Sequence, residues 1–277
     1  MKKMLSLALV LVLMMSLAAC GAKTEAPAAT TAPAAAAETT AAAAETEAAA
    51  AEVSTIEAGK LIMSTNASFP PYEMIADDGS FEGIDVEVAG AIAQKLGLEL
   101  EVDDMDFDAA LLAVQQNKSD IVMAGVTVTE DRKLVMNFTD SYATGVQVVI
   151  VKEGSDVTLD NLGEKMIGTQ RGTTGYIYTS DDYGDDHVTA YDNGASAVQA
   201  LQNGQVDCVV IDAAPAEAYV EANPGLTILD TEYVTENYAI GVNKDNAALL
   251  DAINGALAEL TADGTLDAIV GKYISAE

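Results

Sequence analysis

The sequence DIVMAGVTVTEDR, at residues 120–132, carries the clearest indication of how this chain folds. Its first half, residues 120–125, is an apolar run that predicts a buried strand. Its second half begins a helix, because Thr129 is a suitable N-cap and acidic residues follow in the first turn. A glycine, two threonines and Arg132 therefore lie where a strand gives way to a helix, which is where ligands bind in open α/β sheets.

Strand and helix patterns alternate on both sides of this segment. Apolar residues recur every four positions over residues 84–96, for example, and predict an amphipathic helix that Gly97 ends. Further strands are predicted at 60–65, 98–102, 146–151, 166–169, 188–191, 206–211 and 238–242, and further helices at 108–116, from 173, at 195–203, at 214–221 and twice within 246–273. This alternation favours an α/β fold with parallel strand pairing. Two such series in about 225 residues indicate two lobes of about a hundred residues each.

The composition of the 277 residues argues against several classes of function. The formal charge is −31, from 44 acidic and 13 basic residues, and nucleic-acid binding relies on a basic surface. Cys20 and Cys208 are the only cysteines, which excludes a disulfide scaffold and a Cys-rich zinc site. His187 is the only histidine, so little material exists for His-based catalysis or a multi-His metal site. We predict no metal and no cofactor.

The N-terminus has the pattern of an export signal. A basic start at residues 1–3 precedes an apolar run at residues 4–17, which is too short to span a membrane comfortably but suits a signal peptide. Small residues lead up to Cys20, and this arrangement resembles the bacterial lipobox. The resemblance implies a signal peptide at residues 1–19, cleavage before Cys20 and lipid attachment to its sulfur. The alternative is an ordinary signal peptide with an incidental cysteine.

The segment after Cys20 differs in composition from the rest of the chain. Residues 22–52 hold 17 Ala, 6 Thr and 5 Glu and no large apolar residue. Such a segment buries too little surface to offset its ordering entropy, so residues 20–52 are predicted to be a disordered tether. Of the 44 acidic residues, 39 lie within residues 53–277, so the acidity belongs to the part that folds.

Several positions carry side chains suited to binding, and each has a plain structural alternative. Arg132 offers a planar fork for a carboxylate, but it could instead pair with the acidic residues before it. The segment QRGTTG at residues 170–175 precedes a helix whose free N–H groups attract anions, although an ordinary strand-to-helix turn is favoured. Asp212 closes a buried strand, where it could bind a cation or cap the next helix. Phe69 and Phe107 could clamp a ligand or pack in the core.

Five motifs in this order resemble the family 3 solute-binding proteins, the polar amino-acid receptors of ATP-driven importers. They are TNASFPPYE (65–73), MDFD (105–108), AGVTVTEDR (124–132), GTT (172–174) and ADGT (262–265). The resemblance covers residues 55–277 and implies a periplasmic-binding-protein type II fold, in which two lobes, each a mostly parallel sheet flanked by helices, are joined by two hinge crossovers. It places lobe 1 at residues 53–144 plus 240–277 and lobe 2 at residues 145–239.

The resemblance also implies how a free amino acid is held. Arg132 would bind the α-carboxylate, assisted by the backbone N–H groups of Thr127 and Thr174. Asp212 would take the α-ammonium with the Thr127 hydroxyl and the Gly125 carbonyl. Two phenylalanines would sandwich the side chain. The full set of implied ligand contacts is Asn66, Phe69, Phe107, Ala124, Gly125, Thr127, Arg132, Gln170, Thr173, Thr174 and Asp212.

The residues expected around the end of the ligand side chain indicate which amino acid binds. Several relatives that bind glutamine or cationic amino acids carry an acid where this chain has Asn66. The neutral Asn66 therefore offers no carboxylate anchor for a basic side chain. Ala124 and Gly125 with the two phenylalanines look closest to glutamine receptors, which favours a neutral polar ligand such as glutamine. Glu73 or Asp106 could still supply a negative charge and leave basic ligands open. No catalytic residue is implied.

The predicted function is that of a monomeric extracellular receptor that delivers a polar amino acid to the permease of an ABC importer. Its predicted location is the outer face of the cytoplasmic membrane, or the periplasmic side where an outer membrane exists, with the lipid as anchor. One alternative is an exported enzyme similar to cyclohexadienyl dehydratases, with Glu73 as the candidate acid–base group. Another is an extracellular amino-acid sensor domain.

Overall fold

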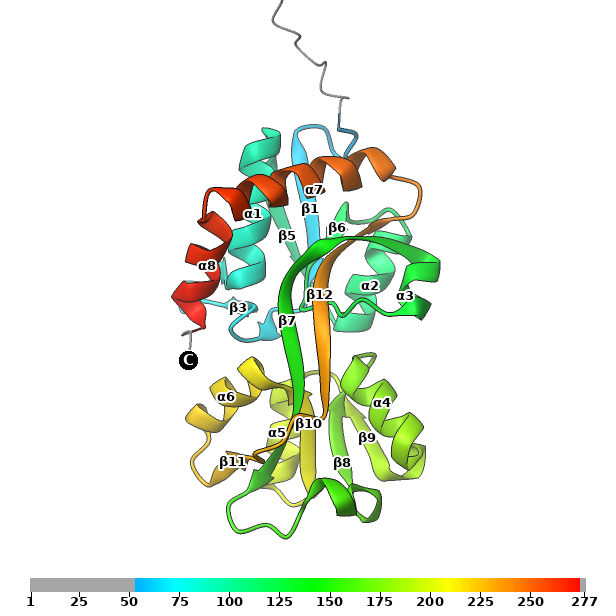
Figure 1. The fold of residues 1–277 in the computed structure, drawn as a ribbon, viewed down its shortest axis with the longest axis vertical. Coiled ribbons are helices and arrows are strands. Elements are labelled where there is room, and N and C mark those ends of the chain that lie inside the picture. Colours follow the sequence, from blue (N-terminus) through cyan, green and yellow to red (C-terminus); the bar gives the residue numbers. More distant parts are fainter. Residues whose placement is uncertain (1–52, 275–277) are drawn as a thin grey trace, which may run out of the picture. The chain divides into compact units, whose positions relative to one another are not determined.

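The computed structural model describes residues 53–274, which form two lobes connected by two long strands (Figure 1). The predicted signal peptide, Cys20 and the tether lie outside the described residues. Within residues 53–274, none of the helices combines the length and the apolar character that a membrane crossing requires.

Lobe 1 is built on β1 (Lys60–Thr65), as the sequence predicted. This strand pairs in parallel with β5 (Glu99–Asp104) on one side and β6 (Ile121–Val122) on the other. A small antiparallel sheet precedes the first helix and consists of β2 (Ser68–Phe69), β3 (Glu73–Ile75) and β4 (Phe81–Glu82). The helices that follow are α1 (Ile84–Leu96), α2 (Phe107–Gln115) and α3 (Glu130–Val135). The predicted period of four in α1 is confirmed, because Val88 and Ile92 are fully buried in the core.

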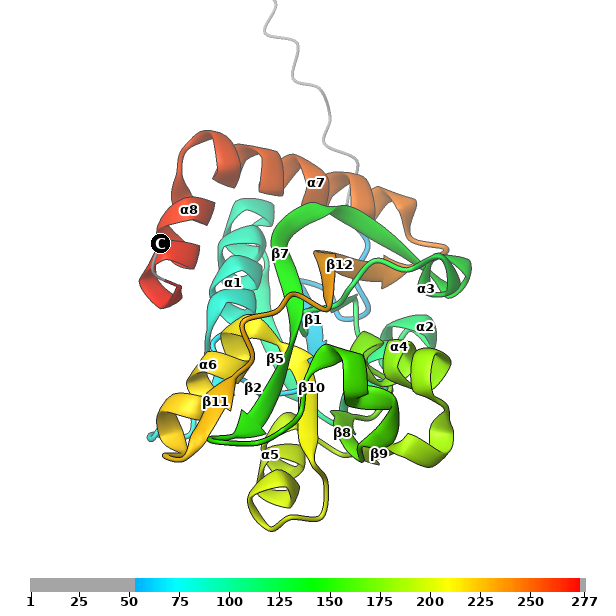
Figure 2. The ribbon, with the colours of Figure 1, turned by 60° about the horizontal axis from the view of Figure 1, so that its bottom comes forward.

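Lobe 2 repeats the alternation of strands and helices. Its strands are β8 (Ile167–Gln170), β9 (Val188–Tyr191), β10 (Cys208–Asp212) and β11 (Leu226–Ile228), and its helices are α4 (Thr174–Tyr183), α5 (Gly194–Gln202) and α6 (Ala213–Ala222). Short 3₁₀ helices lie at Leu159–Glu164 and Asp185–His187. In Figure 2, β10, β8 and β9 follow one another beside β7, and the pairings β10–β8 and β8–β9 are parallel.

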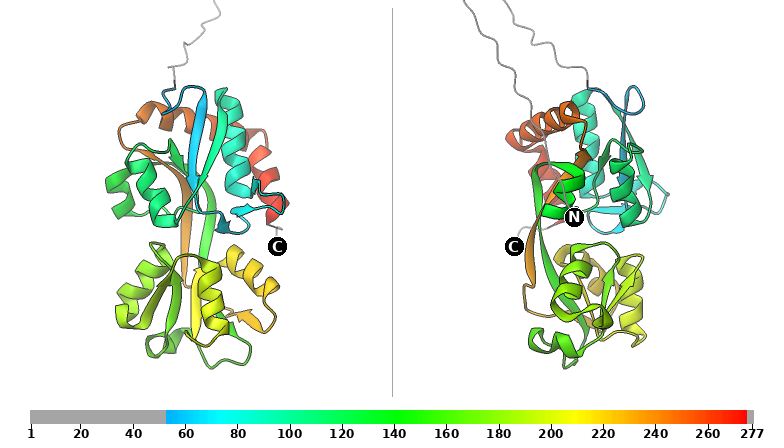
Figure 3. Two further views of the ribbon diagram at one scale, coloured as in Figure 1. Left: turned by 180° about the vertical axis from the view of Figure 1, so that it is seen from behind. Right: turned by 90° about the vertical axis from the view of Figure 1, so that its right-hand side faces the viewer.

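The two connecting strands make one continuous sheet of both lobes. These are β7 (Met136–Lys152) and β12 (Val234–Asn243), which pair antiparallel and run from one lobe into the other (Figure 3). The strand order is β5-β1-β6-β12-β7-β10-β8-β9, and β11 also pairs with β7. The two crossovers that the resemblance implied are therefore present as adjacent strands.

The last two helices return to lobe 1, a point that the local sequence pattern left open. They are α7 (Ala247–Ala262) and α8 (Thr265–Tyr273). Lys95 of α1 forms ion pairs with Glu259 at 3.1 Å and with Asp263 at 3.2 Å, at the end of α7. Helices α7 and α8 both pack against α1 of lobe 1.

One predicted strand is much shorter than its apolar run. The sequence favoured a strand over residues 120–125, but β6 ends at Val122. The chain then turns at Gly125, whose φ is 55°, and its backbone pairs with β12 instead. Val128 N–H donates to the Asn237 carbonyl at 3.0 Å, and Ala239 N–H donates to the Val126 carbonyl at 3.1 Å. This turn places residues 124–127 beside lobe 2.

Candidate binding site between the lobes

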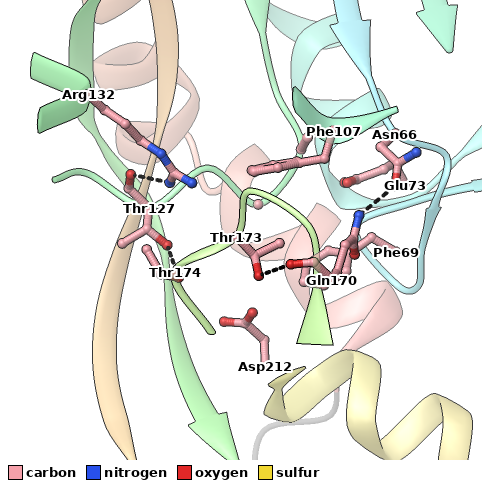
Figure 4. Close-up of a pocket in the computed structure, with 12 residues that line it drawn as sticks. Asn66, Phe69, Glu73, Phe107, Thr127, Arg132, Gln170, Thr173, Thr174 and Asp212 are labelled. Atoms are coloured by element: carbon pink, nitrogen blue, oxygen red, sulfur yellow. Dashed lines mark hydrogen bonds between the residues drawn. The ribbon is translucent and has the colours of Figure 1, made fainter. Parts of the chain in front are cut away.

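A small cavity lies between the lobes (Figure 4). Eight of its twelve lining residues come from lobe 1 and four from lobe 2. They are Asn66, Phe69, Glu73, Phe107, Ala124, Gly125, Thr127 and Arg132, with Gln170, Thr173, Thr174 and Asp212. All eleven predicted contact residues are thus brought together, and Glu73 joins them.

The chain topology explains why these residues meet. Asn66 follows β1, Ala124 follows β6, and Gln170 and Asp212 are the last residues of β8 and β10. The carboxyl ends of neighbouring parallel strands open at one edge of a sheet, where ligands bind. Thr173 is the N-cap of α4, and its hydroxyl accepts the Tyr176 N–H at 3.3 Å. The cavity therefore lies at strand ends and helix starts of both lobes.

Arg132 is buried and points into this cavity. Its Nη1 donates to the Thr127 carbonyl at 2.8 Å, and its Nη2 donates across the lobes to the Gly172 carbonyl at 3.1 Å. Burial lowers the pKa of the guanidinium. The alternative that Arg132 pairs with Glu130 or Asp131 is wrong, because neither acid forms an ion pair with it and Glu130 pairs with Lys133 at 2.8 Å. No carboxylate of residues 53–274 forms an ion pair with Arg132, so the guanidinium is available to an anionic ligand group.

Asp212 has the position of a helix cap without acting as one. It is the N-cap residue of α6, yet its side chain makes no capping hydrogen bond. The carboxylate instead accepts Nε2 of Gln147 at 2.8 Å and the hydroxyl of Tyr238. Burial raises the pKa of this carboxyl to about 7. The capping alternative is therefore wrong, and a buried anion is available to a cationic ligand group.

Glu236 is a second buried carboxylate near this site that the sequence analysis missed. It lies on β12 with 4% of its surface exposed, and it accepts Nε2 of Gln147 at 2.9 Å. Gln147 thus bridges Glu236 and Asp212. The sequence offered one indication of this buried polar group, because Gln147 is a polar residue inside the apolar run Val146–Val151.

Glu73 brings an unpaired acid into the cavity. Its side chain has no exposed surface, and neither carboxylate oxygen has a hydrogen-bond partner among residues 53–274. Burial, together with the charge of Asp85, raises the pKa of Glu73 well above its ordinary value. Asp106, the other acid considered from the sequence, is exposed and does not line this cavity.

Besides the bonds to the β12 backbone, four hydrogen bonds between described residues join the lobes around the cavity. One is the bond from Arg132 to Gly172. Gln170 Nε2 donates to Asn66 Oδ1 at 3.0 Å, and the Thr127 and Thr174 hydroxyls are 3.4 Å apart (Figure 4). The fourth runs from the Tyr219 hydroxyl to the Ser68 carbonyl at 2.6 Å. The lobes therefore touch on several sides of the cavity.

The aromatic residues flank the same space. Phe69 and Phe107 are buried and both line the cavity, and the Arg132 guanidinium lies 5.4 Å from the Phe107 ring centroid. Gly125 is required beside Phe69, because a Cβ there would lie 2.8 Å from the ring. Across residues 53–274, no three His, Cys, Asp or Glu side chains are grouped so as to hold a metal ion.

Comparison with known proteins identifies the family. The sequence profile of the bacterial extracellular solute-binding proteins, family 3, matches residues 61–276. A probable histidine-binding protein of Neisseria gonorrhoeae is 34% identical over 222 residues, which is 78% of this chain and 83% of that protein. An ancestral arginine-binding protein bound to arginine is 41% identical with a TM-score of 0.74, covering 78% of this chain and 99% of that one. An ancestral arginine-binding protein bound to glutamine is 40% identical with a TM-score of 0.75, covering 79% of this chain and 99% of that one.

The chain belongs to family 3 of the bacterial extracellular solute-binding proteins, and its fold is the type II fold of periplasmic binding proteins. The family is extracellular, which supports export of this chain. The relatives above are named as binding proteins and not as enzymes.

Proposed function

We propose that this protein is a receptor for a free amino acid, which it passes to the permease of an ABC importer. The observation that carries the proposal is the pairing of one buried cation and one buried anion, Arg132 and Asp212, from different lobes in one cavity. A zwitterion supplies the matching charges, and either residue left unpaired in a closed site would be costly. The named ligands of the relatives, histidine and arginine among them, support an amino acid.

The proposed contacts follow the chemistry of the lining groups. The Arg132 guanidinium donates two hydrogen bonds to the α-carboxylate, which also accepts hydrogen bonds from the backbone N–H groups of Thr127 and Thr174. Asp212 takes the α-ammonium together with the Thr127 hydroxyl and the Gly125 carbonyl. Phe69 and Phe107 enclose the aliphatic part of the ligand side chain. Because contacts to Asp212 and Thr174 add to those of lobe 1 only when the lobes meet, ligand binding favours the closed arrangement.

We further propose that the ligand side chain is basic, with glutamine as the second candidate. The neutral Asn66 favoured glutamine from the sequence, but the structure lines the cavity with Glu73, whose oxygens are unpartnered. A guanidinium or ammonium group would pair with that buried carboxylate. The ancestral arginine-binding proteins solved with arginine and with glutamine support keeping both ligands in the proposal.

Calorimetry with arginine, lysine and glutamine tests this assignment on the unmodified chain and on Glu73→Gln. The unmodified chain should bind at least one of them, with the basic ligands favoured. Removing the Glu73 charge should weaken arginine and lysine about 100-fold, as expected for the loss of one partner of a buried charge pair, and glutamine by less than about fivefold.

The matched control is Asp106→Asn, which removes an exposed acid that does not line the cavity. It should leave all three affinities unchanged. Equal weakening of basic and neutral ligands by Glu73→Gln would contradict the proposed role of Glu73. Failure of the unmodified chain to bind any amino acid in a wider screen of the common twenty would contradict the receptor function.

We also propose the organisation of the exported protein. Residues 1–19 are a signal peptide, Cys20 is lipid-modified, and residues 20–52 tether a monomeric domain to the outer face of the membrane, where it meets the permease. In the domain, lobe 1 comprises residues 53–144 and 240–277, and lobe 2 comprises residues 145–239. The basis is the sequence pattern at Cys20 and the composition of the tether.

Cys20→Ser is expected to move the protein from the membrane fraction of the producing bacterium to the soluble exported fraction, because the lipid anchor is lost. Fractionation followed by immunoblotting measures the shift. Cys208→Ala, at the only other cysteine, which is buried in lobe 2, is the control and should stay with the membrane. Membrane retention of Cys20→Ser would show that the lipid is not the anchor.

A further inference from the structure

Two buried carboxyl groups lie side by side at the edge of the cavity. Glu73 lines it and Asp85 does not, and neither has any exposed surface. Backbone hydrogen bonds hold the start of α1 against the segment before β3: Ile84 N–H donates to the Pro71 carbonyl at 3.1 Å, and Asp85 N–H donates to the Tyr72 carbonyl at 2.9 Å. The two acids are therefore neighbours through the fold, although twelve positions separate them in the sequence.

These carboxyl groups have fewer hydrogen-bond donors than ionised oxygens require. Asp85 Oδ2 accepts the Gly125 N–H at 2.9 Å. The other oxygen of Asp85 and both oxygens of Glu73 have no partner among residues 53–274. A buried carboxylate without donors is strongly disfavoured relative to its protonated form.

The groups that face the pair add no positive charge. They are Tyr72 beside Glu73, Asp104 at the end of β5, Tyr142 on β7, Asp212 at the end of β10 and Tyr219 on α6. No lysine, arginine or histidine of residues 53–274 is hydrogen-bonded or ion-paired to Glu73 or Asp85. Burial raises the pKa of Asp85 to about 6 and that of Glu73 well above its ordinary value. Two adjacent buried acids without a cation do not both ionise easily.

We propose that Glu73 and Asp85 act as one proton-binding pair that determines which side chains the cavity accepts. The pair keeps a proton when the cavity is empty or holds an amide side chain, and it loses that proton when a cationic side chain binds. This inference rests on the proposed amino-acid receptor function. Asp85 acts through Glu73 and through the Gly125 backbone, so it is a positioning residue and not a contact residue.

The proton balance of the two binding modes differs. With a cationic ligand, the O–H bond of the protonated carboxyl breaks, the proton passes to water, and the electron pair stays on the carboxylate that faces the guanidinium or ammonium group. With glutamine, the proton remains and the carboxyl O–H donates to the amide oxygen. Retention or release of one proton thus changes the charge of the cavity by one unit, in step with the charge of the ligand side chain.

The experiment is calorimetry of the full chain with arginine and with glutamine between pH 5.5 and 8, repeated in buffers of different ionisation heat. The ratio of arginine to glutamine affinity should rise with pH, by up to about tenfold per unit while the pair holds its proton. Arginine should release up to one proton more than glutamine. Asp212 faces the α-ammonium of both ligands, so its own titration cancels in the ratio.

Asp85→Asn separates this role from a structural one. The amide oxygen can still accept the Gly125 N–H, but the neighbouring charge is gone, so Glu73 ionises more easily. The rise of the affinity ratio should therefore shift to lower pH. Glu73→Gln, measured in the same series, should remove the pH dependence of the ratio and supplies the test if Asp85→Asn does not fold.

The outcomes distinguish the proton-binding pair from the receptor function. If arginine and glutamine both bind with a ratio that does not change with pH, and with equal proton release, the proton-binding pair is overturned while the receptor function stands. If no amino acid binds the unmodified chain, the receptor function falls and this inference falls with it.

Discussion

Arg132→Ala is expected to weaken the binding of every free α-amino acid by about 100- to 1000-fold, which corresponds to truncation of one member of a buried charge pair. The side chain is 8% exposed and no carboxylate of the described residues pairs with it. Its proposed partner, the ligand α-carboxylate, would then be buried without a cation. Because that carboxylate is common to all amino acids, the loss should be the same for arginine and for glutamine. Calorimetry with both ligands measures it.

Arg171→Ala is the matched control, since Arg171 is the only other arginine of the chain. It is an exposed residue of lobe 2 whose guanidinium lies 3.4 Å from Asp192, with side chains 55% and 73% exposed. Exposed ion pairs contribute little to stability, and neither residue lines the cavity. The control should bind normally. An Arg132→Ala protein that binds with near-normal affinity would overturn the carboxylate assignment.

Asp212→Asn is expected to weaken all amino acids by about 100-fold, because the ligand ammonium loses its buried counter-charge. The amide keeps the size of the side chain, so packing against Tyr238 and Gln147 changes little. The unmodified protein should also bind less tightly as the pH falls below 7, since the pKa of Asp212 is raised to about 7 and the protonated carboxyl no longer opposes the ammonium. The variant should lack this dependence.

Asp192→Asn is the control for this second variant, because it removes a carboxylate of lobe 2 that is exposed and outside the cavity. Its affinity and pH profile should match those of the unmodified protein. Retention of both affinity and pH profile by Asp212→Asn would instead mean that another group receives the ammonium. Glu236, the buried carboxylate that shares Gln147 with Asp212, would then be examined.

Strong local patterns were enough to predict much of the fold. The helix at residues 84–96 and the strand at residues 60–65 have the predicted bounds, because burial on one face and clear stop signals act locally. The strand at residues 120–125 was overestimated. Its apolar residues are buried throughout, but after Val122 the backbone leaves the strand and turns towards β12. Apolar character alone does not distinguish a buried strand from a buried turn.

The site could be predicted only in part, since side-chain direction depends on tertiary structure. Arg132 and Asp212 each had an equally good or better local explanation, and only the folded structure shows that neither an adjacent acid nor the α6 terminus pairs with them. Gln147 and Glu236 are 89 positions apart and meet through the register of β7 and β12. Asp85 reads from sequence as an ordinary acid of a first helical turn, whereas the fold buries it completely.

The side chains that hold Asp212 have a consequence for how this molecule moves. Gln147 belongs to β7 and Tyr238 to β12, so one carboxylate is fastened to both spans that link the lobes. Gly145 leaves the room for this arrangement, because a Cβ there would lie 2.7 Å from Asp212 Oδ1. The ligand contact at Asp212 and the hinge are therefore physically coupled. A substitution in the hinge that makes lobe motion easier should also change the affinity for the ligand.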